Sequence, residues 1–351
     1  MHRLHPFFVF IGSLCIGLIF CVGIFYIGYT PSSWRLDTLS KPLFLYPLLI
    51  IAFELLIRGI RLQILNAIWD RPLTLSKSLI INLAGDFANA VTPASIGGAP
   101  LRGWHLMQNG LPLTKATAVI IGERLTDHLA LITLIILLIL TSDYKAYGLE
   151  FYLPLMAIFS IAGCLFVYFL LKENKTGASH GKLKLWSPSS WLDYWSDNHR
   201  LQQIKEQMIT VWAELKVNFY FMITRGKWRF VLAWVLAFLS QCMRFLLIVS
   251  LAVGLHIEIP VSVCVLWSVC KRYGLDVIPI PGASGVTEAA FIWFFGRYTT
   301  LNTLGIFMLI WRVYSYYIYI LVGGVLLFFT YRDYTSAFSG VRHHFNNWRK
   351  D

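Results

Sequence analysis

The sequence is short of charge, and of acidic residues above all. Only 14% of its 351 residues are charged, and 30 Lys and Arg against 18 Asp and Glu leave a formal net charge of +12. A soluble domain has about 25% charged residues and about 45–50% apolar ones, whereas 57% of this chain is hydrophobic. Such an apolar excess requires lipid around it. It excludes a disordered, fibrous or disulfide-stapled secreted chain.

Signatures of catalysis and of metal binding are missing as well. The sequence has no HExxH, no G-x-S-x-G, no P-loop and no Asp-x-x-Asp motif. Its six cysteines lie in apolar stretches and none belongs to a CxxC motif, so they are expected to pack as small residues. The sequence therefore predicts no enzyme, no metal and no other cofactor. Because the cations fall mostly between apolar runs, they indicate anionic headgroups and not nucleic acid.

Six apolar runs are each about long enough to cross the ~30 Å of a bilayer's hydrocarbon. They are Phe7–Tyr29, Leu43–Leu65, Leu113–Leu140, Phe151–Leu171, Phe230–Leu255 and Leu301–Thr330. The predicted fold class is an all-α polytopic membrane protein with six full transmembrane helices.

Two further apolar regions, Leu75–Arg102 and Val261–Phe295, are interrupted by Gly and Pro and contain acidic residues. Irregular backbone at membrane depth persists only where it is buried in protein or lines a cavity, so both are predicted to be re-entrant hairpins. The alternative is that both regions span the membrane fully, which gives eight crossings. The residues that form the turns are Pro93, Gly97 and Gly98 in the first and Pro281, Gly282 and Gly285 in the second. The shared spacing of Pro four residues before Gly indicates an inverted repeat, and transporters with such repeats bind substrate where the broken helices meet.

The chain divides into two membrane halves. Residues 1–171 form the first half with hairpin 75–102, residues 229–330 form the second with hairpin 261–295, and residues 331–351 form a tail. The polar segment 172–228 between them is basic and rich in tryptophan, and its second part spaces apolar side chains as an amphipathic helix does. It is expected to be a linker on the cytoplasmic surface.

The distribution of Lys and Arg predicts the orientation. With a cytoplasmic N-terminus and hairpins that return to the side they enter from, 21 of the 30 cations lie in the cytoplasm, four outside and five in the membrane. This bias predicts that both termini are cytoplasmic. The 21 include Arg58 and Arg61, assigned to the cytoplasmic end of the second span.

Charged side chains inside the apolar segments are candidates for a functional site. Arg102, Arg124 and Arg312 are expected to bind a lipid phosphate, because a guanidinium binds oxyanions through two parallel hydrogen bonds. The helices that start at Gly98 and Gly285 would add free N–H groups. The carboxylates Glu123, Asp127 and Glu288 are expected to neutralise a cationic headgroup or to relay protons. Arg244, Lys271, Arg272 and Asp276 complete a set that predicts a polar cavity, the alternative for each member being a structural ion pair.

Three blocks carry a resemblance to a known family. They are NAVTPASIGGAPLR at Asn89–Arg102, GERLTD at Gly122–Asp127 and PIPGASGVTEAA at Pro279–Ala290. In this order they resemble the lysylphosphatidylglycerol synthase/flippase transmembrane-region family, over roughly Phe7 to Thr330. The resemblance implies a lipid-handling membrane domain, similar in role to a flippase for aminoacylated phosphatidylglycerol. The chain is expected to be a stand-alone member without the soluble synthase domain, and other such relatives are associated with hopanoid or polyprenyl-linked glycolipid pathways.

Three functions remain open on the sequence. The first is a flippase for a phospholipid, an aminoacylated phosphatidylglycerol or a polyprenyl-linked glycolipid. The second is a membrane-embedded lipid transferase with Glu123 or Asp127 as general base. The third is a membrane partner that anchors a separate glycosyltransferase or synthase through Lys172–Trp228. In each case the expected partners include membrane lipids, and the expected location is the cytoplasmic (inner) membrane of a bacterium.

Overall fold

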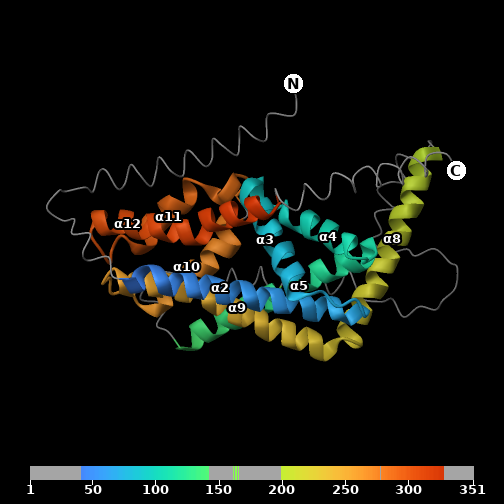
Figure 1. Ribbon diagram of the computed structural model, residues 1–351, viewed down its shortest axis with the longest axis horizontal. Helices are drawn as coiled ribbons and strands as arrows, with labels where there is room; N and C mark the ends of the chain where they lie inside the picture. The colour runs from blue at the N-terminus through green and yellow to red at the C-terminus, as the bar shows by residue number, and fades with distance from the viewer. Residues whose placement is uncertain are drawn as a thin grey trace, which may run out of the picture.

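The computed structural model describes residues 41–141, 199–276 and 278–327, and the single positions 161, 163 and 165. Within these ranges the regular secondary structure is entirely helical (Figure 1), which confirms the predicted fold class. The predicted span Phe7–Tyr29, nearly all of Phe151–Leu171, the first part of the linker and the tail 331–351 lie outside the described residues.

Four of the six predicted spans are described, and each is a helix. They are α2 (Lys41–Asn66), α5 (Leu113–Thr141), α9 (Lys227–Gly254) and the helix that begins as α12 (Leu301–Arg312), passes through the π-helical turn η9 (Val313–Tyr317) and ends at Leu327. All but α2 are long and apolar enough to cross a membrane. At 26 residues α2 measures roughly 39 Å, but it carries Glu54, Arg58 and Arg61. These charges are buried inside the protein, so they do not face lipid.

The first broken region folds back on itself, and its re-entry into the membrane stays a prediction. Helix α3 (Leu75–Val91) and helix α4 (Gly98–Gln108) flank the short turn η4 (Pro93–Ser95). The Gly98 amide donates to Asn89 Oδ1 at 2.9 Å, and Arg102 Nη2 donates to Asp86 Oδ1 at 2.9 Å. A residue further along α4 thus contacts a residue further back on α3, so α3 and α4 form an antiparallel hairpin.

The second broken region contains more interruptions. Helix α10 (Val261–Cys270) continues into the π-helical turn η7 (Lys271–Leu275), and a short turn η8 (Pro281–Ala283) precedes helix α11 (Val286–Phe295). Single π-helical turns are rare and occur frequently at functional sites.

The two hairpin turns share a backbone conformation. Two successive residues with positive φ follow the proline in each turn: Ala94 (51°) and Ser95 (53°) in η4, and Gly282 (61°) and Ala283 (47°) in η8. The left-handed conformation costs about 1–2 kcal/mol for each residue with a Cβ, so its repetition reflects tertiary constraint. The sequence similarity of the two loops therefore corresponds to a similarity of structure.

The tips of the two hairpins meet inside the bundle. Turn η8 contacts both η4 and α3. The Tyr316 hydroxyl donates to the Ala90 carbonyl near the end of α3 at 3.0 Å. A Cβ added to Gly282 would lie 2.5 Å from Tyr316 Oη, so a larger residue at this position would displace the tyrosine that joins the hairpins.

Two apolar clusters lie at different levels of the bundle. One is dominated by the edge-to-face rings of Trp267, Phe291, Phe295, Phe307 and Trp311, and the other joins α2 to α5 by way of α3, α4 and α8. Along α2 the charged residues fall between Ile51 of the first cluster and Leu62 of the second. On α5 the charged residues 123–128 lie between Val119 of the second cluster and Leu131 of the first. On α9, Arg244 lies between Ala233 of the second cluster and Leu247 of the first. The charged residues thus form a layer between two apolar ones.

The linker's second part is a helix, as predicted. Helix α8 (His199–Thr224) buries Leu215, Phe219 and Met222, and it contacts α5 and α9. Figure 1 shows it at one end of the bundle, at a steep angle to the long α2 and α9. Its position on a cytoplasmic surface stays a prediction.

The interpretation of Arg58 and Arg61 as cytoplasmic flanking residues is wrong. Both are buried on α2, with 5% and 2% of their surface exposed. Carboxylates on neighbouring helices pair with them, a feature that counting cations between apolar runs does not detect. The excess of Lys and Arg on the predicted cytoplasmic side then depends on the other cations assigned to that side.

Candidate functional site: a buried ionic cavity

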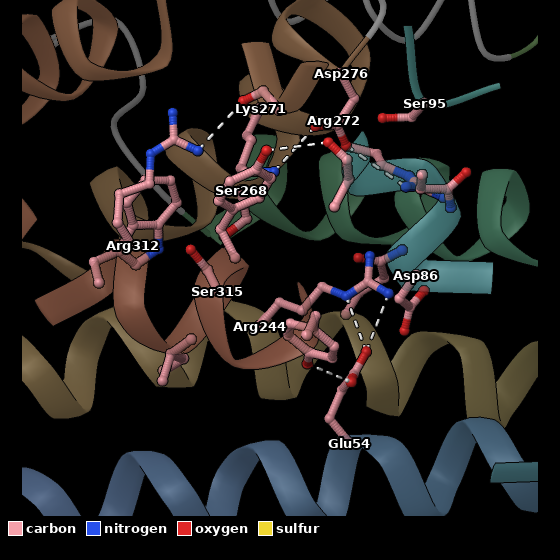
Figure 2. Close-up of a pocket in the computed structure, with 18 of the residues that line it drawn as sticks. Glu54, Asp86, Ser95, Arg244, Ser268, Lys271, Arg272, Asp276, Arg312 and Ser315 are labelled. Carbon is pink, nitrogen blue, oxygen red and sulfur yellow. Dashed lines mark hydrogen bonds and ion pairs between the residues drawn. The ribbon is translucent and has the colours of Figure 1, made fainter. Parts of the chain in front are cut away.

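A cavity of about 220 Å³ opens within the charged layer. Residues of α2, α3, η4, α5, α9, α10, η7, η8, α12 and η9 line it, together with Asp276 and Tyr319. Its charged lining residues are Glu54, Arg58, Asp86, Arg124, Arg244, Lys271, Arg272, Asp276 and Arg312. Figure 2 shows Glu54 and Arg244 toward one side of the view and Lys271, Arg272 and Asp276 toward the other.

At one end, Glu54 is held by four side chains. Its Oε1 accepts hydrogen bonds from Arg244 Nη2 at 3.1 Å and from Ser240 Oγ at 3.1 Å, and its Oε2 accepts from the Tyr319 hydroxyl at 3.2 Å. Arg58, one helical turn further along α2, lies 3.6 Å from Glu54 Oε2. A buried carboxylate is tolerated only with partners of this kind. Glu54 therefore holds α2 and α9 together with the part of the last described helix that contains Tyr319.

Arg58 continues the connection to the first hairpin. Its Nη1 and Nη2 donate to the two oxygens of Asp86 at 2.8 and 2.7 Å, the bidentate geometry that makes such pairs strong. Arg102 also donates to Asp86, and its Nη1 lies 3.6 Å from Glu123 on α5. The pairs therefore join α2, α3, α4 and α5.

From Glu123 the contacts reach the second hairpin. Arg61 lies 3.5 Å from Glu123 and is hydrogen-bonded to Asp127. Asp127 is 3.5 Å from Arg272 on η7, which is 3.6 Å from Asp276. Lys271 Nζ donates to Asp276 at 3.0 Å.

These contacts form one unbroken series of eleven side chains, which we call the ionic chain. In order, its members are Arg244, Glu54, Arg58, Asp86, Arg102, Glu123, Arg61, Asp127, Arg272, Asp276 and Lys271. Cations and carboxylates alternate along it. Removing one partner of a buried ion pair strands the other and costs about 3–5 kcal/mol, so each member fixes its neighbours.

Arg312 and Glu288 form a separate pair at the second hairpin. Arg312 Nε donates to Glu288 Oε1 at 2.6 Å, and Nη1 donates to the Gly282 carbonyl at 3.3 Å. The other Glu288 oxygen accepts from the Gly285 amide at 2.6 Å, which caps the first turn of α11. This pair holds turn η8 against the last helix.

Arg124 differs from the other cations of the cavity. It lies on the cavity wall and is partly buried. Among the residues that the structure describes, no carboxylate lies within ion-pair distance of its guanidinium. Its five N–H donors are therefore free to meet a ligand.

The structure brings two of the three predicted arginines to the cavity. Arg124 and Arg312 line it, whereas Arg102 is occupied by Asp86 and Glu123 behind the wall. The predicted carboxylates Glu123, Asp127 and Glu288 are all paired with arginines and do not belong to the lining.

The predicted turn residues have different surroundings. Gly282 lines the cavity. Gly97 and Gly98 pack tightly against Thr92 and Asn89, and Gly285 begins α11. Pro93 and Pro281 each start their short turn. Arg244, Lys271, Arg272 and Asp276, expected in a polar cavity, all lie on its wall.

Sequence reasoning assigned no role to Glu54, Asp86 or the aromatic part of the wall. A signal was available in two segments, Trp267-Ser268-x-x-Lys271-Arg272 and Trp311-Arg312-x-x-Ser315-Tyr316. Positions i, i+1, i+4 and i+5 lie on one face of a helix. All eight residues of the two segments line the cavity.

The fold and the site define a multi-pass helical membrane protein with an ionic cavity between two apolar layers. The model of the family described as "Lysylphosphatidylglycerol synthase TM region" matches residues 10–323, and the chain belongs to this family. A UPF0104 membrane protein of Archaeoglobus fulgidus is 21% identical over 315 residues, which cover 85% of this chain and 90% of that relative. The predicted family is thereby confirmed.

Proposed function

We propose that the protein translocates a phosphate-bearing lipid across the membrane, with the lipid's head group passing through the ionic cavity. The observation that carries this proposal is the position of Arg124, which has no carboxylate partner among the described residues, in a cation-rich cavity where the two hairpin tips meet. A head group that crosses a bilayer must avoid the hydrocarbon, where a charge costs at least about 2.5–3.5 kcal/mol. A polar cavity between two apolar layers supplies such a path.

Polar groups on the cavity wall would take the place of the water molecules that hydrate the phosphate outside the membrane. Arg124 and Arg312 present guanidinium groups, which bind phosphate oxygens in pairs. The backbone breaks at η4 and η8 lie at the same place, where two halves of the molecule would rock against one another. Arg102 acts indirectly in this proposal, because it lies behind the wall and orients Asp86, which lines the cavity, and Glu123, which does not.

The proposal involves no covalent change in the lipid. Glu123 and Asp127, the candidate general bases, are each paired with two cations. Neither carboxylate belongs to the lining of the cavity, so neither is placed to act on a lipid bound there. Translocation in the cytoplasmic membrane of a bacterium, with both termini in the cytoplasm, is part of the same proposal.

The test is lipid translocation in proteoliposomes. The purified protein is reconstituted with tail-labelled phosphatidic acid or tail-labelled phosphatidylglycerol, and an impermeant reductant bleaches the label in the outer leaflet. We expect faster loss of inner-leaflet fluorescence than in empty vesicles, and a rate near that of empty vesicles for Arg124→Gln. Mass spectrometry of the recovered lipid should show an unchanged mass.

The matched control is Arg225→Gln, at an exposed site next to α8. It removes the same charge from a position outside the cavity, so its rate should equal that of the wild type. Arg102→Ala is a poorer test, because it removes one of the two cations paired with Asp86 and with Glu123 and so disturbs the fold as well as the cavity. Wild-type rates in Arg124→Gln for both labelled lipids, or no translocation by the wild type, would overturn the proposal.

A further inference from the structure

We infer that the cavity selects a phosphate group with two negative charges, such as a phosphomonoester or a diphosphate, over a singly charged phosphodiester or a head group bearing an ammonium. The inference deepens the proposed function, on which it rests where it assigns the phosphate to a lipid. Four features of the cavity support it, namely its charge balance, the position of the excess charge, its unsatisfied donors and the occupation of its carboxylates.

The charge balance leaves two positive charges in excess. The ionic chain begins and ends with a cation, and so contains six cations and five carboxylates. The Arg312–Glu288 pair is neutral, and Arg124 adds one further cation. The side chains of Arg244, Lys271 and Arg272 are 33%, 30% and 27% exposed, so water compensates these charges in part. A charge in such a partly enclosed site still gains from an opposite charge beside it. A dianion compensates the excess in full, whereas a monoanion compensates half of it.

The excess charge is concentrated on one side of the cavity. Arg124 has no carboxylate partner in the described part of the chain, and its charge and that of Arg272 repel one another. Arg272 lies 3.5 and 3.6 Å from its two carboxylates, longer than the 2.7–2.9 Å typical of strong charged hydrogen bonds. Lys271 shares one of those carboxylates, Asp276. An anion among Arg124, Lys271 and Arg272 would relieve this crowding.

Neutral donors on the wall are also unsatisfied. Gln241 Nε2, Trp267 Nε1 and Ser315 Oγ are buried and line the cavity, and none has a hydrogen-bond partner among the described residues. A buried donor without a partner costs about 1–3 kcal/mol. Because an indole N–H can only donate, it requires an acceptor. Phosphate oxygens accept from all three donors and from Arg124.

An ammonium group would find no equivalent site. The three carboxylates of the wall are Glu54, Asp86 and Asp276. Each lies within ion-pair distance of two cations already. A lysyl ammonium would add to the positive excess without gaining a free carboxylate. The wall therefore disfavours a cationic head group.

The test compares lipids that differ only in the head group. The full-length protein in detergent is titrated at pH 8 with phosphatidic acid, phosphatidylglycerol and lysylphosphatidylglycerol of identical acyl chains, and bound lipid is measured by native mass spectrometry. A phosphomonoester, with a second pKa of about 6, is then dianionic. We expect phosphatidic acid to bind about tenfold or more tightly than phosphatidylglycerol, since one more charged hydrogen-bonding contact is gained, and lysylphosphatidylglycerol to bind most weakly.

Two variants test the assignment to the cavity. Arg124→Gln should reduce the preference for phosphatidic acid to about twofold or less, the loss expected when one of the charged contacts is removed. Arg225→Gln should retain the full preference. Equal binding of phosphatidic acid and phosphatidylglycerol by the wild type, or tightest binding of the lysyl lipid, would overturn the inference without reference to any variant.

Inorganic phosphate and inorganic diphosphate distinguish a lipid head from free phosphate. If either ion displaces phosphatidic acid and also binds alone in an Arg124-dependent manner, the preference for a dianion stands with phosphate itself as the recognised group. A preference for phosphatidic acid without translocation in vesicles supports this inference and overturns the proposed function. Translocation of both lipids without any preference in binding supports the proposed function and overturns this inference.

Discussion

Arg58 and Asp86 face each other as a bidentate pair, with N–O distances of 2.7 and 2.8 Å. The pair joins the middle of α2 to the first broken hairpin, two elements that are 28 positions apart in sequence. Both side chains line the cavity. The same contact therefore shapes the wall and positions the hairpin, which links the stability of the fold to the geometry of the site.

Asp86→Asn is expected to destabilise the protein by about 3–5 kcal/mol, because Arg58 and Arg102 lose their shared carboxylate inside the bundle. Thermal unfolding in detergent measures the effect. Asp70→Asn is the control, since Asp70 is exposed in a left-handed conformation that asparagine also adopts. Equal melting temperatures for the two variants would show that the pair contributes little.

Gly282→Ala should destabilise the meeting point of the hairpins. The alanine would be strained at a φ of 61°, and its Cβ would lie 2.5 Å from Tyr316 Oη. The left-handed conformation alone costs about 1–2 kcal/mol, and displacement of Tyr316 adds to it. Gly274→Ala is the matched control, because a Cβ there has no neighbour within 4 Å.

Both glycine variants are compared by thermal unfolding and by vesicle translocation. We expect Gly282→Ala to lower the melting temperature and the translocation rate, and Gly274→Ala to leave both near the wild-type values. A Gly282→Ala protein as stable and as active as the wild type would show that the Tyr316 contact is dispensable.

Glu288→Gln and the double variant Glu288→Gln/Arg312→Gln separate stability from transport. The single change leaves Arg312 without its carboxylate and should cost about 3–5 kcal/mol. The double change removes both charges, so part of the stability should return. Translocation should stay low in both variants. In the single variant Arg312 is no longer held in position by Glu288, and in the double variant the charge of Arg312 is absent. Recovery of transport in the double variant would assign Arg312 a purely structural role.

Phe219→Ala tests the docking of α8 onto the membrane helices. Phe219 is 1% exposed in the cluster that joins α8 to α5, and truncating a buried phenylalanine costs about 3–5 kcal/mol. We expect faster amide hydrogen exchange throughout α8. Tyr220→Ala, at a neighbouring site that is 55% exposed, should exchange as the wild type does.

The location of the helices and hairpins was predictable because those signals are local. Apolar runs placed α5 and α9 within a few residues of their ends, and the Gly/Pro interruptions placed η4 and η8. The spacing Pro93 to Gly97 and Pro281 to Gly285 predicted an inverted repeat, and the two turns share a backbone conformation that the spacing did not predict. Arg58 and Arg61 were misplaced because α2 carries its charges inside a long apolar run, where composition cannot distinguish a buried site from a flank.

The amino-acid sequence by itself determined that this chain is a helical membrane protein, where its helices break, and which apolar segments carry ionisable residues. Only the tertiary structure decided which of those residues are paired and which remain free. Arg102 lies in the first broken hairpin and Arg124 in the span that follows it, yet Arg102 is held by two carboxylates, whereas Arg124 faces the cavity with no carboxylate partner in the described part of the chain. An arginine side chain reaches several ångströms, so its partner depends on which helices approach it, and that approach is set by packing between residues far apart in the chain.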